Sequence, residues 1–336
     1  MITSIRIENL RGIRDGTLEA LTPLVVLVGP NGAGKSTILD ALLIGAGRRP
    51  AACVGYVVER RSGLRHGARW LLHRGGEGMG QLDLGFADGS RRRSALAWSA
   101  EDGVAPALRR HLQGKDGPYS EIEVTISPSG SSGACVFSAK NEYFAEEIPE
   151  VNAERSTAWL VDPRLGTTLH DLYSRVAEHG RRQALLDLVV PLVPGLRLVE
   201  VLTEHGDPRL NLTFDDRSIP VALAGDGIQS LVRLALELAT RREKTILLEE
   251  PEAHQHPAAI RASAQAIVAG IRSGRQIVLS THSMELVDAL IDALGDQELP
   301  KLTLFRVKLN DGILLRSRLE GPDVLAMRQD IAEDLR

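Results

Sequence analysis

Four separated stretches of this chain carry residue types that could bind and cleave a phosphate anhydride. The first, Gly29–Thr37, reads GPNGAGKST and matches G-x-x-x-x-G-K-[S/T] at every position. Glycines in such a loop let consecutive backbone N–H groups turn towards phosphates, and a following helix N-terminus adds its positive dipole end. The Lys35 amine can reach the β- and γ-phosphates, and the Ser36 hydroxyl can ligate Mg²⁺. The loop therefore predicts nucleotide binding.

The second stretch, TILLEE over 245–250, is an apolar strand that ends in two carboxylates. A carboxylate at this point can hold the Mg²⁺ shell, and the next one can polarise water for in-line attack on the γ-phosphate. We expect Glu249 to serve the metal and Glu250 to act as the general base. Aspartate is more common at the first position, and the longer Glu249 is expected to act through a metal-bound water.

The third and fourth stretches are expected to approach the same ligand. QIVLSTH over 276–282 is an apolar strand that ends in Thr281 and His282. Because ligands bind beyond the carboxyl ends of parallel strands, His282 is a candidate to contact the γ-phosphate or the attacking water. AGDGIQS over 224–230 opens a helix, and its glycines let the backbone approach an anion.

A histidine pair follows the two carboxylates. The segment 251–257 reads PEAHQHP, with His254 and His256 two positions apart. A zinc site would need further ligands at comparable spacing, and no cysteine lies nearby. We therefore expect a turn that carries dimer contacts beside the nucleotide.

Apolar periodicity predicts the elements that would position these stretches. The expected strands cover 2–7, 24–28, 197–202, 210–214, 245–248, 276–279 and a β pair within 302–315. The expected helices follow Lys35 as far as Gly45 and Gly47, cover 169–190 with a break at Gly180, and follow Gly227. Between Arg48 and Asn141 the chain is rich in Gly and Arg, with alternating stretches that indicate β structure. This order implies a parallel sheet with helices on its faces and an inserted lobe.

Length and composition exclude several classes of protein. The chain has 336 residues, 43% apolar and 25% charged, which is ordinary for one large or two medium globular domains. Its two cysteines, Cys53 and Cys135, lie far apart and indicate neither a disulfide framework nor a metal site. The N-terminus has no apolar signal-peptide core, and no run approaches 18 apolar residues. We expect a cytoplasmic chain that does not span a membrane.

Charge is unevenly distributed. The net charge is −4, yet the segment from Arg48 to Lys115 holds 13 Lys or Arg against six acids. Such asymmetry is a hint of a surface that faces a polyanion, and it is equally compatible with a solvated Arg-rich face.

Taken in order, these motifs resemble ABC-type ATPases of the soluble AAA-21/AAA-15 kind, relatives of RecF, of structural-maintenance-of-chromosomes (SMC) heads and of the overcoming-lysogenization-defect nucleases. The opening IRIENLRGIRDGTLEAL is similar to the family's first hairpin, and DLYSRVAEHGRRQALLDLV is similar to its helical lobe. The resemblance implies an α/β P-loop NTPase with an ABC-type parallel sheet core, an N-terminal antiparallel β part and an inserted mixed lobe. Its expected parts are 1–47 and 216–336 for the core and 48–215 for the insert.

The family pattern assigns roles to individual positions. It makes Gly29, Pro30, Asn31, Gly32, Ala33, Gly34, Lys35, Ser36 and Thr37 the Walker A loop, Glu249 and Glu250 the Walker B pair, and His282 the switch histidine. It makes Gly225, Asp226 and Gly227 the signature that completes the partner subunit's site, with His254 and His256 in the D-loop. The signature lacks the LSGGQ of transporters, and Gln81 is the one position considered for the Q-loop glutamine. The resemblance implies Mg²⁺-dependent hydrolysis of ATP to ADP and phosphate by a head-to-tail homodimer.

Three coupled roles are compatible with such an ATPase. The first is a DNA-associated repair or prokaryotic defence complex, which the basic segment favours because Arg and Lys supply most non-specific affinity for nucleic acid. The second is the nucleotide-binding subunit of a transporter, which the missing LSGGQ disfavours. The third is the regulation of a nuclease or effector on a separate chain, because the 54 residues after His282 are too few for a Toprim domain.

Overall fold

The computed structural model describes residues 1–61, 64–76, 78–104, 108, 110–147, 157–162, 167–241 and 243–330. The chain forms two compact units, each assembled from separated segments. Unit 1 contains 1–22, 27–160 and 305–318, and unit 2 contains 23–26, 161–304 and 319–336. The division into an ATPase core of 1–47 and 216–336 and an inserted lobe of 48–215 stays a prediction.

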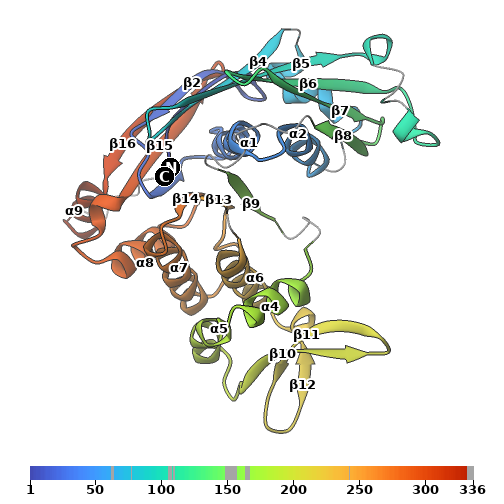
Figure 1. Cartoon of the computed structure of the whole chain (residues 1–336). Coiled ribbons are helices and arrows are strands. Elements are labelled where there is room, and N and C mark those ends of the chain that lie inside the picture. The colour runs from blue at the N-terminus through green and yellow to red at the C-terminus, as the bar shows by residue number, and fades with distance from the viewer. Residues whose placement is uncertain are drawn as a thin grey trace. The chain divides into compact units, whose positions relative to one another are not determined.

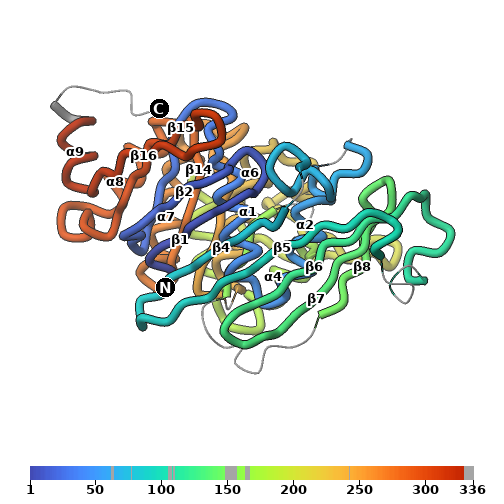
Figure 2. Tube along the Cα trace, turned by 90° about the horizontal axis from the view of Figure 1, so that it is seen from above, coloured from blue at the N-terminus to red at the C-terminus, as the bar shows by residue number. Residues whose placement is uncertain are grey.

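The antiparallel strands of unit 1 follow one another along a sheet in the order β8-β7-β6-β5-β4-β1-β2. Figure 2 shows β1, β4, β5, β6 and β7 side by side. Their bounds are Ile2–Leu10 (β1), Ile13–Glu19 (β2), Met79–Phe86 (β4), Arg91–Ser99 (β5), Ser120–Ser127 (β6), Ser131–Phe137 (β7) and Tyr143–Glu147 (β8). The strands after residue 78 therefore extend the N-terminal hairpin, because β4 pairs with β1.

Two helices of unit 1 follow the first strands (Figure 1). α1 (Lys35–Ala46) begins directly after the glycine loop, as predicted, and is buried along almost its whole length. α2 (Pro50–Glu59) lies in the stretch for which the sequence indicated only β structure. Its proline at the first turn suits a helix start, and its apolar residues recur at helical spacing. This helical periodicity covers only ten residues within a stretch rich in Gly and Arg, and it was not recognised from the sequence.

Unit 2 holds the parallel pair of strands at which the carboxylates and the late histidine end. β13 (Thr245–Glu249) pairs in parallel with β14 (Gln276–Ser280), which neighbours β3 (Leu24–Val28) in the sheet order. The helices are α4 (Leu169–Glu178), α5 (Arg182–Val189), α6 (Asp226–Thr240), α7 (Pro257–Arg272), α8 (Met284–Leu294) and α9 (Gly321–Asp330). Three further strands, most of whose residues belong to unit 1, are β9 (Ala158–Val161), β15 (Leu302–Asn310) and β16 (Ile313–Glu320).

A second, three-stranded sheet belongs to unit 2. β10 (Leu198–Glu204), β11 (Asp207–Thr213) and β12 (Ser218–Pro220) pair antiparallel and pack with α4, α5 and α6 around one apolar cluster. The predicted helix break at Gly180 is confirmed, because α4 ends before it and α5 starts after it. With parallel and antiparallel pairs and helices alternating with strands, the predicted α/β class is confirmed. Among the described residues, no helix combines the length and apolarity needed to cross a membrane.

Candidate functional site

The phosphate loop of unit 1 has the backbone that its glycines predict. β3 is fully buried and ends at Val28, and Gly29 follows at φ 147°. A Cβ at Gly29 would lie 2.2 Å from the Val307 carbonyl oxygen, so no other residue fits there. Gly32 and Gly34 also have positive φ, which lets the loop turn back towards α1.

Lys35 is held inside this loop. Its side chain is 6% exposed, and its Nζ donates to the carbonyl oxygens of Gly29 at 2.6 Å and Pro30 at 3.1 Å. These bonds place an ammonium group within the loop, where it can face a phosphate. A bound triphosphate would exchange carbonyl partners for anionic oxygens, which make stronger charge-assisted hydrogen bonds.

The start of α1 suits an anion. Gly34 caps the helix without a side-chain hydrogen bond, and the first turn carries no acidic residue. The dipole and the first backbone N–H groups of the helix therefore meet no competing carboxylate from its own first turn. Ser36 is half-buried in that turn, at the position predicted for a Mg²⁺ ligand.

In unit 2, strand register brings together the predicted base and switch histidine. Glu249 pairs with Ser280, and the Glu250 N–H donates to the Ser280 carbonyl at 3.0 Å. His282 then follows at the same sheet edge, with its Nε2 3.4 Å from Glu250 Oε1. Both side chains are partly solvent-accessible. Glu250 has φ 45°, a strained backbone for a residue with a Cβ, and such strain is concentrated at functional sites.

Glu252 is a third carboxylate in this group, and no pattern in the sequence predicted a role for it. Its Oε1 accepts from the Thr281 hydroxyl at 2.5 Å and from the His282 N–H at 3.2 Å. Burial, with a smaller contribution from Glu250, raises its pKa above the ordinary glutamate value. Because the pKa of Glu252 is higher in the folded chain than in the unfolded chain, the folded state loses stability as the pH rises from the unfolded to the folded pKa. Glu252 fixes the backbone from which His282 projects.

The signature and D-loop candidates contact each other within unit 2. A Cβ on Gly227 would lie 3.2 Å from the His254 carbonyl oxygen and 3.3 Å from Gln255 Cα. His256 caps α7, because its Nδ1 accepts from the Ala258 N–H at 3.3 Å. Within the described ranges, no group of three or more His, Cys, Asp or Glu side chains is placed to hold a metal ion.

Gly225 differs from Gly227, because nothing in the described structure requires it to be glycine. Its φ is −60°, and an added Cβ would meet no atom within 4 Å. The nearby Leu223 leaves 76% of its surface exposed, more than any other large apolar residue among those described. Both features leave room for another molecule.

A pocket of about 250 Å³ connects the two carboxylates with the helix that follows the signature candidate. Glu249, Glu250 and His254 line it from the strand end, and Ser230 and Arg233 line it from α6. Burial lowers the pKa of Arg233, while neighbouring acids oppose that shift. The pocket therefore places a cation opposite the carboxylates, which no motif in the sequence predicted.

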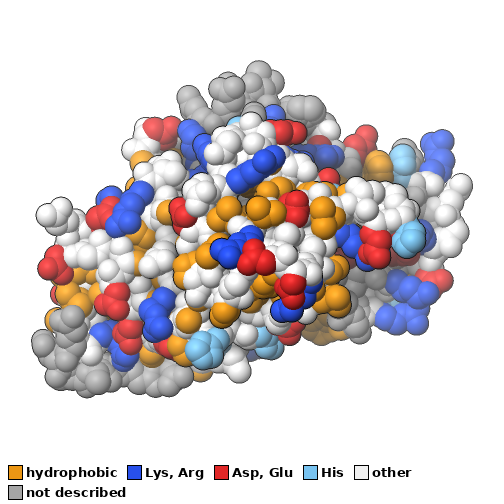
Figure 3. All heavy atoms as spheres, turned by 90° about the horizontal axis from the view of Figure 1, so that it is seen from below, with side chains coloured by type: hydrophobic (Ala, Val, Ile, Leu, Met, Phe, Trp, Pro, Cys, Tyr) orange, Lys and Arg blue, Asp and Glu red, His pale blue; other side chains and the backbone are white. Residues whose placement is uncertain are grey.

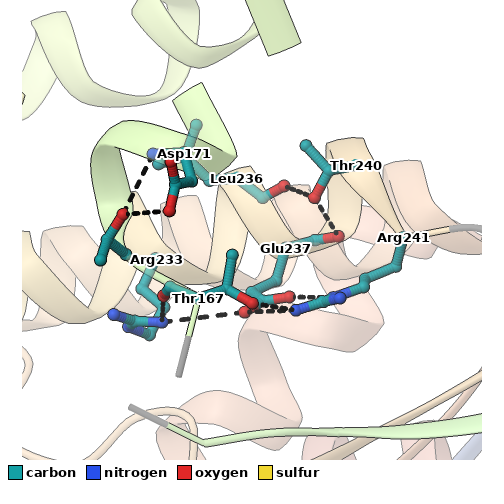
Figure 4. Close-up of polar contacts among 8 residues, drawn as sticks. Thr167, Asp171, Arg233, Leu236, Glu237, Thr240 and Arg241 are labelled. Atoms are coloured by element: carbon teal, nitrogen blue, oxygen red, sulfur yellow. Dashed lines mark hydrogen bonds and ion pairs between the residues drawn. The ribbon is translucent and has the colours of Figure 1, made fainter. Parts of the chain in front are cut away.

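Arg233 belongs to a polar network along α6 (Figure 4). Glu237 is 1% exposed and lies between Arg233, at 3.7 Å, and Arg241, which donates to it through Nε. The Arg233 Nη1 and Arg241 Nη2 also donate to Thr167, at 3.3 Å each. The network joins α6 to the segment that precedes α4.

Replacing Glu237 by alanine should destabilise the fold strongly. The change removes the carboxylate that lies between two partly buried guanidinium groups, and breaking such a pair costs about 3–5 kcal/mol. The free energy of unfolding from urea titration measures the effect. Glu178→Ala, at an exposed position on α4, is the control and should change stability by no more than about 0.5 kcal/mol. A loss below about 1 kcal/mol for Glu237→Ala would contradict a structural role for this network.

The structure also shows where the predicted Q-loop candidate and the basic segment lie. Gln81, considered for the Q-loop, is an exposed residue within β4, opposite Glu8 of β1. Of the basic segment, Arg109 lies outside the described residues. Arg60 and Arg61 each approach the buried Asp40 at 3.7 Å. Part of the positive charge of the segment is therefore neutralised by an acid within unit 1.

Two family models match overlapping parts of the chain. An AAA domain described as a putative AbiEii toxin of a type IV toxin–antitoxin system matches residues 138–288, and another AAA domain matches 4–147. A Helicobacter pylori protein named ATP/GTP phosphatase is 21% identical over 367 residues, covering 96% of this chain and 97% of that protein. An uncharacterized Methanocaldococcus jannaschii protein is 27% identical over 114 residues, covering 33% of this chain and 98% of its own.

Solved structures share the fold. One is an Smc head bound to the C-terminal winged-helix domain of ScpA, with TM-score 0.53, 13% identity and coverage of 95% of this chain and 98% of that chain. Another is an Smc head with an extended coiled coil, bound to the C-terminal domain of ScpA derived from Pyrococcus furiosus. Its TM-score is 0.54 at 11% identity, and it covers 99% of each chain. The predicted resemblance is confirmed at this level: AAA domain models together match residues 4–288, and the chain has the fold of Smc heads.

Proposed function

We propose that this protein binds ATP with Mg²⁺ and hydrolyses it to ADP and phosphate as an ABC-type ATPase. The observation that carries the proposal is the phosphate loop, in which three positive-φ glycines and an enclosed Lys35 ammonium precede a helix start without acidic residues. This loop fits the phosphates of a nucleotide. Ser36 and Glu249 would hold the metal, which would neutralise phosphate charge when bound.

Glu250 and His282 are the residues that we assign to the reaction. Glu250 takes a proton from the attacking water, whose oxygen forms a bond to the γ-phosphorus while the bond to the β–γ bridging oxygen breaks and ADP leaves. The His282 ring, 3.4 Å from Glu250, is assigned to orient that water or the γ-phosphate. Glu252 supports this pair as a positioning residue, because it accepts the His282 N–H.

We further propose that two copies act head to tail, with Gly225, Asp226 and Gly227 of one copy facing the nucleotide of the other. Open space around Gly225 supports this role, because its own fold places no steric demand for glycine there. The exposed Leu223 supplies apolar surface that a partner would cover.

The Gly225→Val variant tests the dimer. Its own chain should fold and bind ATP as the wild type does, because a Cβ at this position meets no atom within 4 Å and the φ of −60° is open to any residue. ATP turnover and ATP-dependent dimerisation, followed by phosphate release and analytical ultracentrifugation, should both fall by about tenfold or more if a partner's nucleotide approaches this glycine. Ala222→Val, three positions earlier and also exposed, is the matched control. Unchanged turnover in Gly225→Val would contradict the head-to-tail arrangement and would not affect the assignment of the phosphate loop.

The coupled process that we propose is a DNA-associated repair or defence complex. The support is the basic segment Arg48–Lys115, of which Arg48, Arg49 and Arg65 are exposed in unit 1. Ion pairs consume part of the charge elsewhere, since Arg91 and Arg93 both approach Asp83. Nucleic acid affinity would therefore depend on the exposed subset.

DNA binding should be steeply salt-dependent if this role is correct. With about six phosphate contacts, affinity for duplex DNA should fall by about 10³-fold between 50 and 200 mM salt. Fluorescence anisotropy with a labelled duplex measures it. Replacing Arg48, Arg49 and Arg65 by glutamine should weaken binding and flatten the slope, whereas Arg182→Gln with Arg261→Gln in unit 2 should not. A flat or absent signal would contradict the DNA role and favour an ATPase that regulates a separate protein effector.

A further inference from the structure

Unit 2 contains a second pocket, separate from the carboxylates, among α4, α5, α6 and α7. Its volume is about 190 Å³. Its floor consists of buried apolar residues, including Val176, Leu185 and Leu236. Figure 3, which views the molecule from below, shows hydrophobic side chains gathered on the surface with basic and acidic side chains between them.

Small residues keep this pocket open. α6 contributes Ala235 and Ala239, and α7 contributes Ala266, Ala269 and Gly270. At the positions where helices would normally interdigitate large side chains, these residues leave a depression beside Leu185. Ala269 is exposed, so the pocket reaches the surface.

Two arginines stand at the polar end of the pocket. Arg181 precedes α5, and its Nη1 donates to the Ala239 carbonyl at 3.0 Å. Arg275 follows α7, and its Nη2 donates to the Arg241 carbonyl at 2.9 Å, while its Nη1 donates to the Ser273 hydroxyl at 2.6 Å. Each guanidinium carries five N–H donors in a fixed fork. These bonds therefore hold the two guanidinium planes in place and use only some of their N–H donors.

The positive charge of the two arginines is incompletely compensated. The pKa of Arg275 is lowered by burial first and by the Arg181 charge second, and Glu243 is the acid that opposes the shift. Glu243 does not line the pocket. The pocket mouth therefore combines two cations with an apolar interior, which suits an occupant that is apolar at one end and anionic at the other.

The volume of the pocket limits which occupants fit. Pockets for drug-sized ligands and cofactors measure roughly 300–1,000 Å³, which exceeds this volume. A cavity of about 150 Å³ accepts a benzene ring, so one large apolar side chain fits here. Interfaces typically place one such anchor in a pocket and surround it with polar contacts.

We propose that this pocket docks a peptide segment of a partner protein, in which a Leu, Phe or Trp side chain fills the apolar floor and a neighbouring Asp or Glu pairs with Arg181 and Arg275. The inference does not depend on ATP hydrolysis, because no residue of the pocket belongs to the phosphate loop or to the carboxylate group.

Peptide selection tests the chemistry of the occupant. A phage library of random 12-residue peptides is selected on the immobilised full chain without nucleotide, and in parallel on the Arg181→Glu/Ala269→Trp variant, whose two changes are at exposed positions. Peptides enriched only on the wild type should carry an aromatic residue or Leu within two positions of Asp or Glu. The same peptides enriched on both proteins, no enrichment on the wild type, or enriched peptides without acidic residues would each overturn the proposal.

Single variants then locate the binding site for one synthetic enriched peptide. Its dissociation constant should rise by about tenfold in Arg181→Glu, which turns attraction into repulsion, and by at least as much in Ala269→Trp, which fills the pocket. Arg182→Glu, at the next position along the chain, and Gln265→Trp, also on α7, are the matched controls, since both positions are exposed and neither lines the pocket. Equal effects in variant and control would place the peptide elsewhere and reject the pocket.

Discussion

The Lys35→Ala variant should lose affinity for ATP by roughly two orders of magnitude. The change removes an ammonium that sits inside the loop, within hydrogen-bond distance of the Gly29 and Pro30 carbonyls. Two charge-assisted hydrogen bonds to phosphate at about 1.5 kcal/mol each, the lower end of their usual range, account for a loss of this size. Equilibrium binding of a fluorescent ATP analogue to the full chain measures it.

Two controls make the Lys35 result specific. Lys308→Ala removes an exposed lysine of β15 and should leave ATP affinity unchanged. Circular dichroism should show that Lys35→Ala remains folded, because the carbonyls that it frees belong to a loop with an exposed Pro30. Unchanged ATP affinity in a folded Lys35→Ala protein would remove the assignment of this loop as the nucleotide site.

The Glu250→Gln variant should bind ATP normally and hydrolyse it at least 100-fold more slowly. The amide keeps the size of the side chain but cannot accept a proton from water, and general base catalysis is worth about 10²–10⁴ in rate. Single-turnover phosphate release measures the chemical step. Because ATP persists, the closed dimer should accumulate, and sedimentation velocity in the presence of ATP should show it.

Neighbouring carboxylates supply the comparison for Glu250. Glu285→Gln changes an exposed glutamate in the first turn of α8 and should leave turnover intact. Glu252→Gln retains an acceptor for Thr281 and His282 and should reduce turnover less than Glu250→Gln does. If Glu250→Gln hydrolyses ATP at the wild-type rate and Glu252→Gln does not, the base is Glu252.

The consequence of local sequence is clearest at the phosphate loop and the elements that flank it. A run of five buried apolar residues, a glycine loop and a helix from Lys35 follow one another in the chain, and the structure contains them in that order. Each depends on interactions over a few residues, such as the carbonyl at Gly29 that Lys35 meets six positions later. The break at Gly180 and the two strands that precede the carboxylates and His282 were equally readable, because period and turn residues are local signals.

Other features depend on pairings between distant residues, and these had no local signal. Glu250 meets His282 only because β13 and β14 pair in one register, and a shift of one residue would send each side chain to the opposite face. Glu252 contacts Thr281 across 29 positions of sequence for the same reason.

The buried charge on α6 illustrates the same limit. Arg233, Glu237 and Arg241 recur every four residues, a pattern equally common on solvated helices, whereas in the folded chain Glu237 is buried. The sequence by itself thus determined the loop, the strands and the residue types able to do the chemistry, since these follow from neighbours along the chain. Tertiary structure decided which carboxylate meets the histidine, which glycine stands open and which arginines line a pocket, because burial and register are properties of the whole fold.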